Sequence, residues 1–132
     1  MSFKLKSIVL LLALLVVGIS SCTEDPAAPT ISGTEVGENN SMTATIGGEL
    51  HMDAEIVAEG KIDKITIDLH PEGFTADDIE AEYTSYSGQL NADFHEDLDI
   101  PATAVAGEYH FHMTVTDQEG QTTSFEADVD IQ

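Results

Sequence analysis

Residues 109–116 read Tyr109-His110-Phe111-His112-Met113-Thr114-Val115-Thr116, with an apolar side chain at each odd position and a polar one at each even position. This period of two is typical of a β-strand with one buried and one exposed face. Asp117-Gln118-Glu119-Gly120 follows, and Phe125, Ala127, Val129 and Ile131 then repeat the alternation. Because Gly120 tolerates the positive φ of a tight turn, the two stretches predict a β-hairpin.

The same alternation recurs nearer the N-terminus, in segments 49–58, 65–70 and 93–100. Two weaker candidate strands lie at 30–36 and 42–46. Residues 75–87 fit either a short helix or a strand, and we expect an irregular connection with one edge strand. About seven strands predict an all-β fold, an immunoglobulin-like or fibronectin-III-like β-sandwich. Tyr109 stands where such domains carry the tyrosine corner.

The N-terminal segment has a different pattern. Lys4 and Lys6 precede an unbroken apolar run over residues 8–19, and Ile19-Ser20-Ser21-Cys22 ends it. This layout is typical of a secretory signal, and the run is shorter than the about 20 residues that span hydrocarbon. It resembles the bacterial lipobox, which implies a signal peptide over 1–21 and lipidation of Cys22. The alternative is an ordinary signal peptide followed by a chance cysteine.

Glu24 and Asp25, directly after the cysteine, resemble the acidic export tag of Bacteroidota-type surface lipoproteins. The alternative is a merely polar start of a linker. Residues 22–29 are polar and interrupted by proline, which is typical of a linker, and the sandwich is expected over 30–132. We therefore expect an exported protein that is lipid-anchored to the outer membrane through Cys22 and faces the cell exterior.

The charge of the chain is strongly acidic. All 25 Asp and Glu residues follow residue 21, where only two of the four basic residues, Lys61 and Lys64, oppose them, which leaves a net charge of −23. Nucleic acid is excluded as a partner, because phosphate binding needs a basic surface. Such a charge attracts cations and keeps the protein soluble. Because Cys22 is the only cysteine, the domain must fold without a disulfide.

Four further pieces of the chain read Ile65-Thr66-Ile67-Asp68-Leu69-His70, Leu98-Asp99-Ile100-Pro101, Gly107-Glu108-Tyr109-His110-Phe111-His112 and Val115-Thr116-Asp117-Gln118-Glu119-Gly120. Together with Asp68-Leu69-His70-Pro71 they resemble a family of small Bacteroidota-type lipoproteins of unknown function. The resemblance covers residues 30–132 and implies an immunoglobulin-like fold. It implies no activity.

The histidines suggest a binding site. His110 and His112 point the same way, to solvent, because the apolar residues between them fill the inward positions. If the hairpin closes with a three-residue loop, His112 faces Glu126 and His110 faces Asp128, with Cβ atoms about 5 Å apart. In a sandwich of this topology the strand at 65–70 pairs with the one at 109–116, which adds its outward residues to the same face.

The candidate metal ligands on this face are His70, His110, His112, Asp68, Glu126 and Asp128. Imidazole and carboxylate together suit zinc, copper or nickel. A second, weaker group combines His51 and His95 on the other sheet, with Asp53, Asp93 and Asp97 nearby. The alternative for both groups is a solvated strand face. Calcium at Asp117, Glu119 and Asp77-Asp78 would lack the usual loop motif.

No motif for catalysis is found: Gly-x-Ser-x-Gly, His-Glu-x-x-His and a glycine-rich phosphate loop are all missing. We expect that the protein is not an enzyme, because sandwich domains of this size usually bind a ligand or act as spacers and do not catalyse. The expected function is a surface lipoprotein that binds zinc or copper, as an accessory to an outer-membrane uptake system. The alternative is a metal-independent adhesive or structural module that binds protein or glycan by its loops, with Tyr83 and Tyr86 as exposed anchors. Those two rings could instead pack at the edge of the sandwich.

Overall fold

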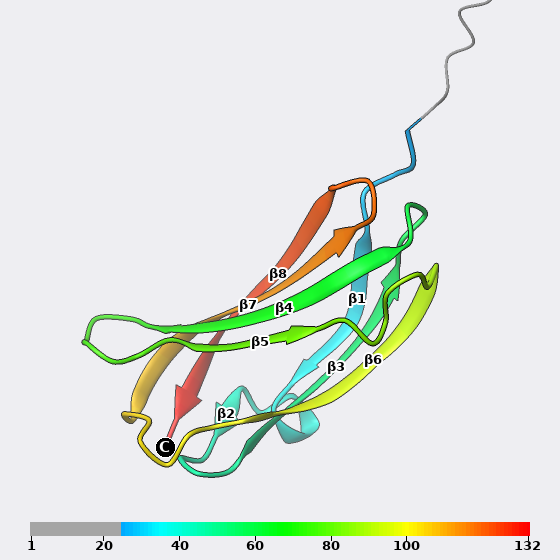
Figure 1. Ribbon diagram of the computed structural model, residues 1–132. Coiled ribbons are helices and arrows are strands. Elements are labelled where there is room, and N and C mark those ends of the chain that lie inside the picture. The colour runs from blue at the N-terminus through cyan, green and yellow to red at the C-terminus, as the bar shows by residue number, and fades with distance from the viewer. Residues whose placement is uncertain (1–24) are drawn as a thin grey trace, which may run out of the picture.

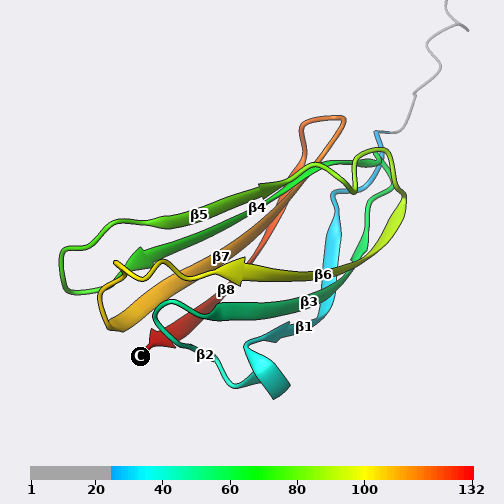
Figure 2. The ribbon, with the colours of Figure 1, turned by 60° about the horizontal axis from the view of Figure 1, so that its bottom comes forward.

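Alternating apolar and polar residues form strands along the whole domain, and the computed structural model describes residues 25–132. The strands form two sheets that face each other (Figure 1). One sheet consists of β1 (Thr30–Val36), β3 (Glu49–Val57) and β6 (Asn91–Asp99), in the order β1-β3-β6. The other consists of β2 (Thr43–Ala44), β4 (Ile62–Pro71), β5 (Ile79–Tyr83), β7 (Gly107–Asp117) and β8 (Thr122–Ile131), in the order β2-β8-β7-β4-β5. Figure 2 shows these two layers one above the other.

The architecture confirms the prediction of an all-β sandwich. Within residues 25–132 the helical structure is limited to the 3-10 turn η1 (Glu38–Asn40), and no helix there is long and apolar enough to cross a membrane. The predicted signal peptide over 1–21, Cys22 and Glu24 lie outside the described residues.

The β7–β8 hairpin has the predicted register. His112 pairs with Glu126 and His110 pairs with Asp128. The loop contains three residues, because the Asp117 amide donates to the Gln121 carbonyl at 2.9 Å, and Gly120 takes φ 83°. The buried Asp117 carboxylate accepts hydrogen bonds from the Glu119 and Gln121 amides. The hydrogen bonds within the turn therefore explain why the Asp117 carboxylate is there, and no calcium ion is needed to explain it.

The core lies between the sheets and is formed by the inward positions predicted for each strand. Leu50, Met52, Ile67, Leu69, Phe94, Phe111, Met113 and Val129 are buried there. Burying each large side chain contributes about 1.5–3 kcal/mol. Met52 and Met113 are thus core residues and not metal ligands.

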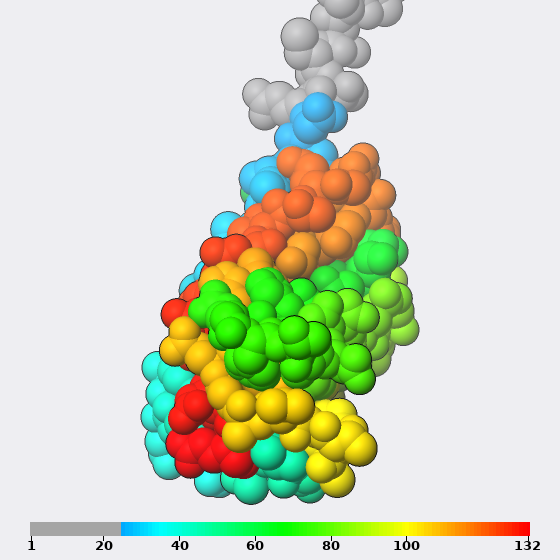
Figure 3. All heavy atoms as spheres, turned by 90° about the vertical axis from the view of Figure 1, so that its left-hand side faces the viewer, coloured from blue at the N-terminus to red at the C-terminus, as the bar shows by residue number. Residues whose placement is uncertain are grey.

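Tyr109 forms the predicted tyrosine corner. Its ring is fully buried, and its hydroxyl donates to the Val105 carbonyl at 2.7 Å. Phe74 packs edge-on against it, with ring centroids 5.3 Å apart. Gly107 leaves room for that ring, because a Cβ there would lie 2.7 Å from Phe74. These contacts join the loop after β4 to the loop before β7, which lie side by side in green and yellow in Figure 3.

The segment 75–87 contains one edge strand, β5, as expected, but its tyrosines are not exposed. Tyr83 and Tyr86 pack against Phe94 of β6, with ring centroids 5.3 and 5.6 Å away. The Tyr86 hydroxyl donates to Glu96 at 2.8 Å, and burial raises the pKa of both phenols. Of the two alternatives for these tyrosines, exposed anchors for a partner or packing at the edge, the structure shows packing, because both rings close the edge of the sandwich between β5 and β6.

The linker leaves from one end of the sandwich. Gln121 and Thr123 donate side-chain hydrogen bonds to the carbonyls of Pro26 and Pro29, at 2.7 and 2.5 Å. This end carries the β7–β8 turn, whereas the C-terminus and the loops after β4 and before β7 lie at the opposite end (Figure 1).

Candidate metal centre

The outer face of the five-stranded sheet carries three histidines. His110 and His112 lie on β7, and His70 of β4 is paired with His110. Ring centroids are 4.4 Å apart for His110 and His112, 5.3 Å for His70 and His110, and 5.1 Å for His70 and His112. All three point outward because the alternate residues of both strands are buried.

β8 places carboxylates beside two of these imidazoles. His112 Nδ1 lies 3.1 Å from Glu126 Oε1, and His110 Nδ1 lies 3.0 Å from Asp128 Oδ1. His110 Nε2 lies 3.9 Å from Glu126 Oε2. One donor atom each from His110, His112 and Glu126 lie within 4.8 Å of one another, so the three can hold a metal ion. We call His110, His112 and Glu126 the β7–β8 site.

Glu72 also belongs to this neighbourhood, and the sequence analysis missed it. Its carboxylate lies 3.3 Å from His110 Nδ1, and Glu72, His110 and Asp128 form a second set of donors within 4.8 Å. The Glu72 amide donates to the Glu108 carbonyl, which extends the pairing of β4 with β7 beyond Pro71. Extending the strand of His70 by two residues would have placed Glu72 on the same face.

His70 and Asp68 lie on the predicted face but at its other side. His70 Nδ1 is 3.3 Å from Asp68 Oδ2, and within residues 25–132 His70 joins no set of three donors within 4.8 Å. Asp68 instead forms such a set with Asp78 and Glu80, since Glu80 of β5 is its direct partner. The six predicted ligands thus share a face, but only His110, His112 and Glu126 among them come together as a set of three donors.

The surroundings of His110 are strongly negative. The hydrogen bond to Asp128 raises the pKa of His110, and the charges of Glu72 and Glu126 add to that effect. A hydrogen bond to Glu72 raises the pKa of the neighbouring Glu108, which has Asp128 and Asp130 near it as well. A surface with so many carboxylates around one imidazole favours a cation.

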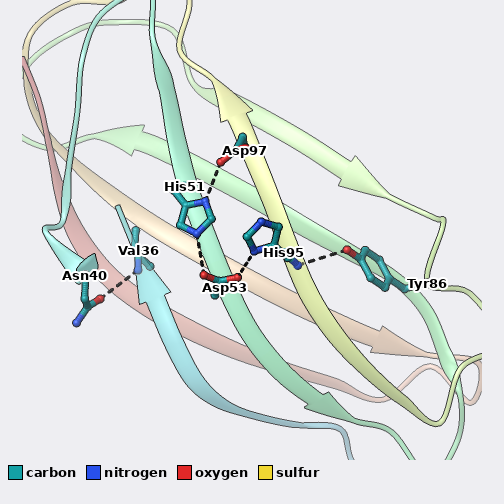
Figure 4. A network of polar contacts seen from close by, with 7 residues as sticks. All are labelled: Val36, Asn40, His51, Asp53, Tyr86, His95 and Asp97. Carbon is teal, nitrogen blue, oxygen red and sulfur yellow. Dashed lines mark hydrogen bonds and ion pairs between the residues drawn. The ribbon is translucent and has the colours of Figure 1, made fainter. Parts of the chain in front are cut away.

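The outer face of the three-stranded sheet carries the other two histidines (Figure 4). β3 and β6 pair His51 with Asp97 and Asp53 with His95. His51 Nε2 lies 2.7 Å from Asp53 Oδ2, and His51 Nδ1 lies 2.8 Å from Asp97 Oδ1. His95 Nδ1 lies 2.5 Å from Asp53 Oδ1. We call His51, Asp53 and His95 the β3–β6 site.

The β3–β6 site is a closed polar network. Hydrogen bonds to Asp97 and Asp53 raise the pKa of His51, and the bond from His95, helped by His51, lowers the pKa of Asp53. His51 and Asp53 are half-buried, while His95 is exposed. Asp93, which was also expected nearby, lies two residues further along the strand pair, opposite Glu55.

Comparison with known proteins gives a family and no activity. The family described as "Domain of unknown function (DUF4625)" matches residues 19–132, which confirms the predicted membership of an uncharacterised family. None of the curated proteins matches the chain. Among solved structures it is similar to "Superoxide reductase (Neelaredoxin) from Ignicoccus hospitalis", at 8% identity and a TM-score of 0.48, over 81% of this chain and 82% of that chain. A substituted form of the same reductase gives 8% identity and a TM-score of 0.47, over 87% and 88%.

These solved structures correct the expectation that the chain is not an enzyme. That expectation rested on the view that a sandwich of this size binds and does not catalyse, and the similar structures are those of a reductase. At 8% identity and TM-scores of 0.48 and 0.47, the likeness assigns neither a reaction nor a residue role to this chain.

Proposed function

We propose that this chain, which belongs to the DUF4625 family of domains of unknown function, binds a divalent transition metal at the β7–β8 site. The observation that carries the proposal is the placement of two imidazoles and a carboxylate on one hairpin, with donor atoms within 4.8 Å of one another. The hairpin holds these side chains in register before any ion arrives, because His112 and Glu126 are direct partners.

The spacing of the donors fits one ion. Ligand atoms about 2.1 Å from a tetrahedral zinc lie roughly 3.4 Å apart. His112 Nδ1 and Glu126 Oε1 are already 3.1 Å apart, and His110 Nε2 is 3.9 Å from the other Glu126 oxygen. Side-chain rotations alone therefore bring all three donors to one ion.

The second nitrogen of His110 has its own partner. Asp128 lies 3.0 Å from Nδ1, which leaves Nε2 available for the ion. A carboxylate on the opposite nitrogen orients a ligand histidine and strengthens it as a donor. Glu72, 3.3 Å from the same Nδ1, adds negative charge.

Zinc or copper is the ion that this donor set suits. Two imidazole nitrogens of borderline character with one carboxylate oxygen suit these ions, and no thiolate is available, since the only cysteine of the chain is Cys22. The acidic excess of the chain raises the local concentration of any divalent cation.

The finer identity of the protein is part of the proposal: a lipoprotein anchored through Cys22 to the outer membrane, facing the exterior, with an immunoglobulin-like domain. The lipobox-like sequence before Cys22 supports the anchor. The sheet orders β1-β3-β6 and β8-β7-β4-β5 and the tyrosine corner support the immunoglobulin-like type. An outer-membrane uptake system is the proposed partner. Among residues 25–132 no exposed Phe or Tyr side chain favours the adhesive alternative, since Tyr83 and Tyr86 are packed.

Calorimetric titration of the protein with zinc and with copper(II) at neutral pH tests the metal site. We expect binding tighter than about 1 µM, which corresponds to about 8 kcal/mol. Zinc should shift the imidazole NMR signals of His110 and His112. The variant His110→Ala/His112→Ala should lose this binding event, while Thr114→Ala, at the next position on the same face, should retain it. Affinity weaker than micromolar for both metals, or unchanged binding in the double variant, would refute the proposal.

A further inference from the structure

The β3–β6 site differs from the β7–β8 site in that its carboxylate lies within hydrogen-bond distance of both imidazoles. Asp53 turns one oxygen to each ring, Oδ2 to His51 Nε2 at 2.7 Å and Oδ1 to His95 Nδ1 at 2.5 Å (Figure 4). The two ring centroids are 4.7 Å apart and the rings meet edge to face. The three side chains thus converge on one point above the sheet.

Asp97 accounts for the second nitrogen of His51. A neutral imidazole has one N–H and one lone pair. When Nδ1–H donates to Asp97 Oδ1 at 2.8 Å, the lone pair of Nε2 points at Asp53 Oδ2, only 2.7 Å away. A lone pair and a carboxylate oxygen at that distance repel each other unless a positive particle, a proton or a metal ion, lies between them.

From this geometry we propose a second metal site, separate from the β7–β8 site, in which His51 Nε2, Asp53 and His95 bind a divalent transition ion and Asp97 positions His51. Asp53 is now closer to each imidazole than the roughly 3.4 Å between ligand atoms on one zinc, so the ion enters by small outward rotations of the three side chains. A polar hollow of about 620 Å³ borders His51 and Asp97, between them and the η1 and β2 segments.

The chemical class of the ion follows from the ligands. Two imidazoles and one carboxylate leave coordination positions open to water, an arrangement that suits zinc and also iron(II). His95 is 67% exposed at its side chain, so those positions face solvent.

The two sites cannot share an ion. They lie on opposite outer faces of a sandwich whose sheets pack about 10 Å apart, with the buried core between them. The proposal therefore stands or falls independently of the β7–β8 site.

Zinc titration of the whole protein, followed by calorimetry and by imidazole NMR signals, tests the second site. We expect two zinc ions per chain. His51→Ala/His95→Ala should leave one ion, with the signals of His110 and His112 still shifting, and His110→Ala/His112→Ala should leave the other. Circular dichroism checks that each variant folds, and His95→Gln serves as a milder change at an exposed position.

A single ion that only the His110→Ala/His112→Ala variant removes would overturn the second site and leave the first intact. A single ion that only the His51→Ala/His95→Ala variant removes would do the reverse. Binding of two ions to the His51→Ala/His95→Ala variant would also overturn the second site.

The positioning role of Asp97 has its own test. Asp97→Asn should weaken zinc at the β3–β6 site by about 10–100-fold, and the imidazole nitrogen shifts should show that His51 changes its tautomer. Asp99→Asn, the same charge change on the same face of β6, is the matched control. Equal effects of the two substitutions on affinity, or an unchanged His51 tautomer in Asp97→Asn, would overturn this role.

Discussion

On the five-stranded sheet three imidazoles crowd together with carboxylates around them, whereas on the three-stranded sheet one carboxylate contacts two imidazoles. The cause is the cross-strand pairing. β4 and β7 pair His70 with His110, so like groups meet, while β3 and β6 pair His51 with Asp97 and Asp53 with His95. Opposite groups directly across a strand pair attract each other and like charges repel.

The difference teaches how the same residue types give two kinds of surface. In the β3–β6 site each ring nitrogen of His51 has a carboxylate partner within 2.8 Å. In the β7–β8 site, His110 Nε2 has its nearest carboxylate oxygen 3.9 Å away. At the β3–β6 site an ion must displace existing contacts of the His51 nitrogens, whereas at the β7–β8 site it finds His110 Nε2 without a close carboxylate partner.

Removing one carboxylate from each site should give the largest contrast. Asp53→Ala should reduce zinc affinity at the β3–β6 site more than about 100-fold, because Asp53 is the one group that contacts both imidazoles. Glu126→Ala should cost about tenfold at the β7–β8 site, since Glu72 and Asp128 remain beside His110. Site-resolved NMR titration measures both losses. Equal losses at the two sites would break the comparison.

A smaller effect is expected from pH. Metal binding needs a neutral imidazole, and the pKa of His110 is raised by Asp128, with Glu72 and Glu126 adding to it. His70 and His112 also face this ring. As the pH is lowered, zinc affinity at the β7–β8 site should therefore begin to fall while the pH is still above about 6.5. The affinity should drop by about tenfold per pH unit for each proton that zinc must displace.

In the metal-free protein, acidification has the opposite effect: protonation of His110 stabilises the folded state. Because the folded-state pKa of His110 lies above its unfolded value, its contribution to stability is fully present below about pH 6.5 and is lost as pH rises through the raised pKa. Urea unfolding of the protein and of His110→Gln across pH 5–8 checks this. A His110→Gln variant whose metal-free stability and zinc affinity follow the same pH profile as the original protein would contradict the assignment.

The smallest expected effect lies away from both sites. Tyr109→Phe removes the hydrogen bond to the Val105 carbonyl and should cost about 1 kcal/mol of unfolding free energy, which lowers Tm by about 4–8 °C in a domain of this size. Zinc binding at both sites should stay unchanged. Thermal unfolding measures the stability, and calorimetry measures zinc binding. A change in zinc affinity at either site would mean that this site depends on the loops that Tyr109 joins.

Much of the fold could be predicted because its signals are local. Period-two alternation placed the buried residues of β7 and β8, and the turn at Gly120 set their register, so that His112 was correctly placed opposite Glu126. Tyr109 was recognisable as the tyrosine corner. The packing of Tyr83, at the end of β5, and of Tyr86 could not be decided from the sequence, because their burial depends on Phe94 of the other sheet.

The two candidate sites were likewise predictable only where the signal is local. By itself, the sequence determined that all these histidines face outward, since the side-chain alternation of a strand is a property of neighbouring residues. Only the tertiary structure decided which of them meet. Pairing across β3 and β6 brings His95 to Asp53, 42 residues away in the chain, beside His51. Pairing with β5 turns Asp68 toward Asp78 and Glu80. The physical reason is that a metal site needs donor atoms within a few ångströms, and such distances between separate strands are set by register and sheet order, which no single segment contains.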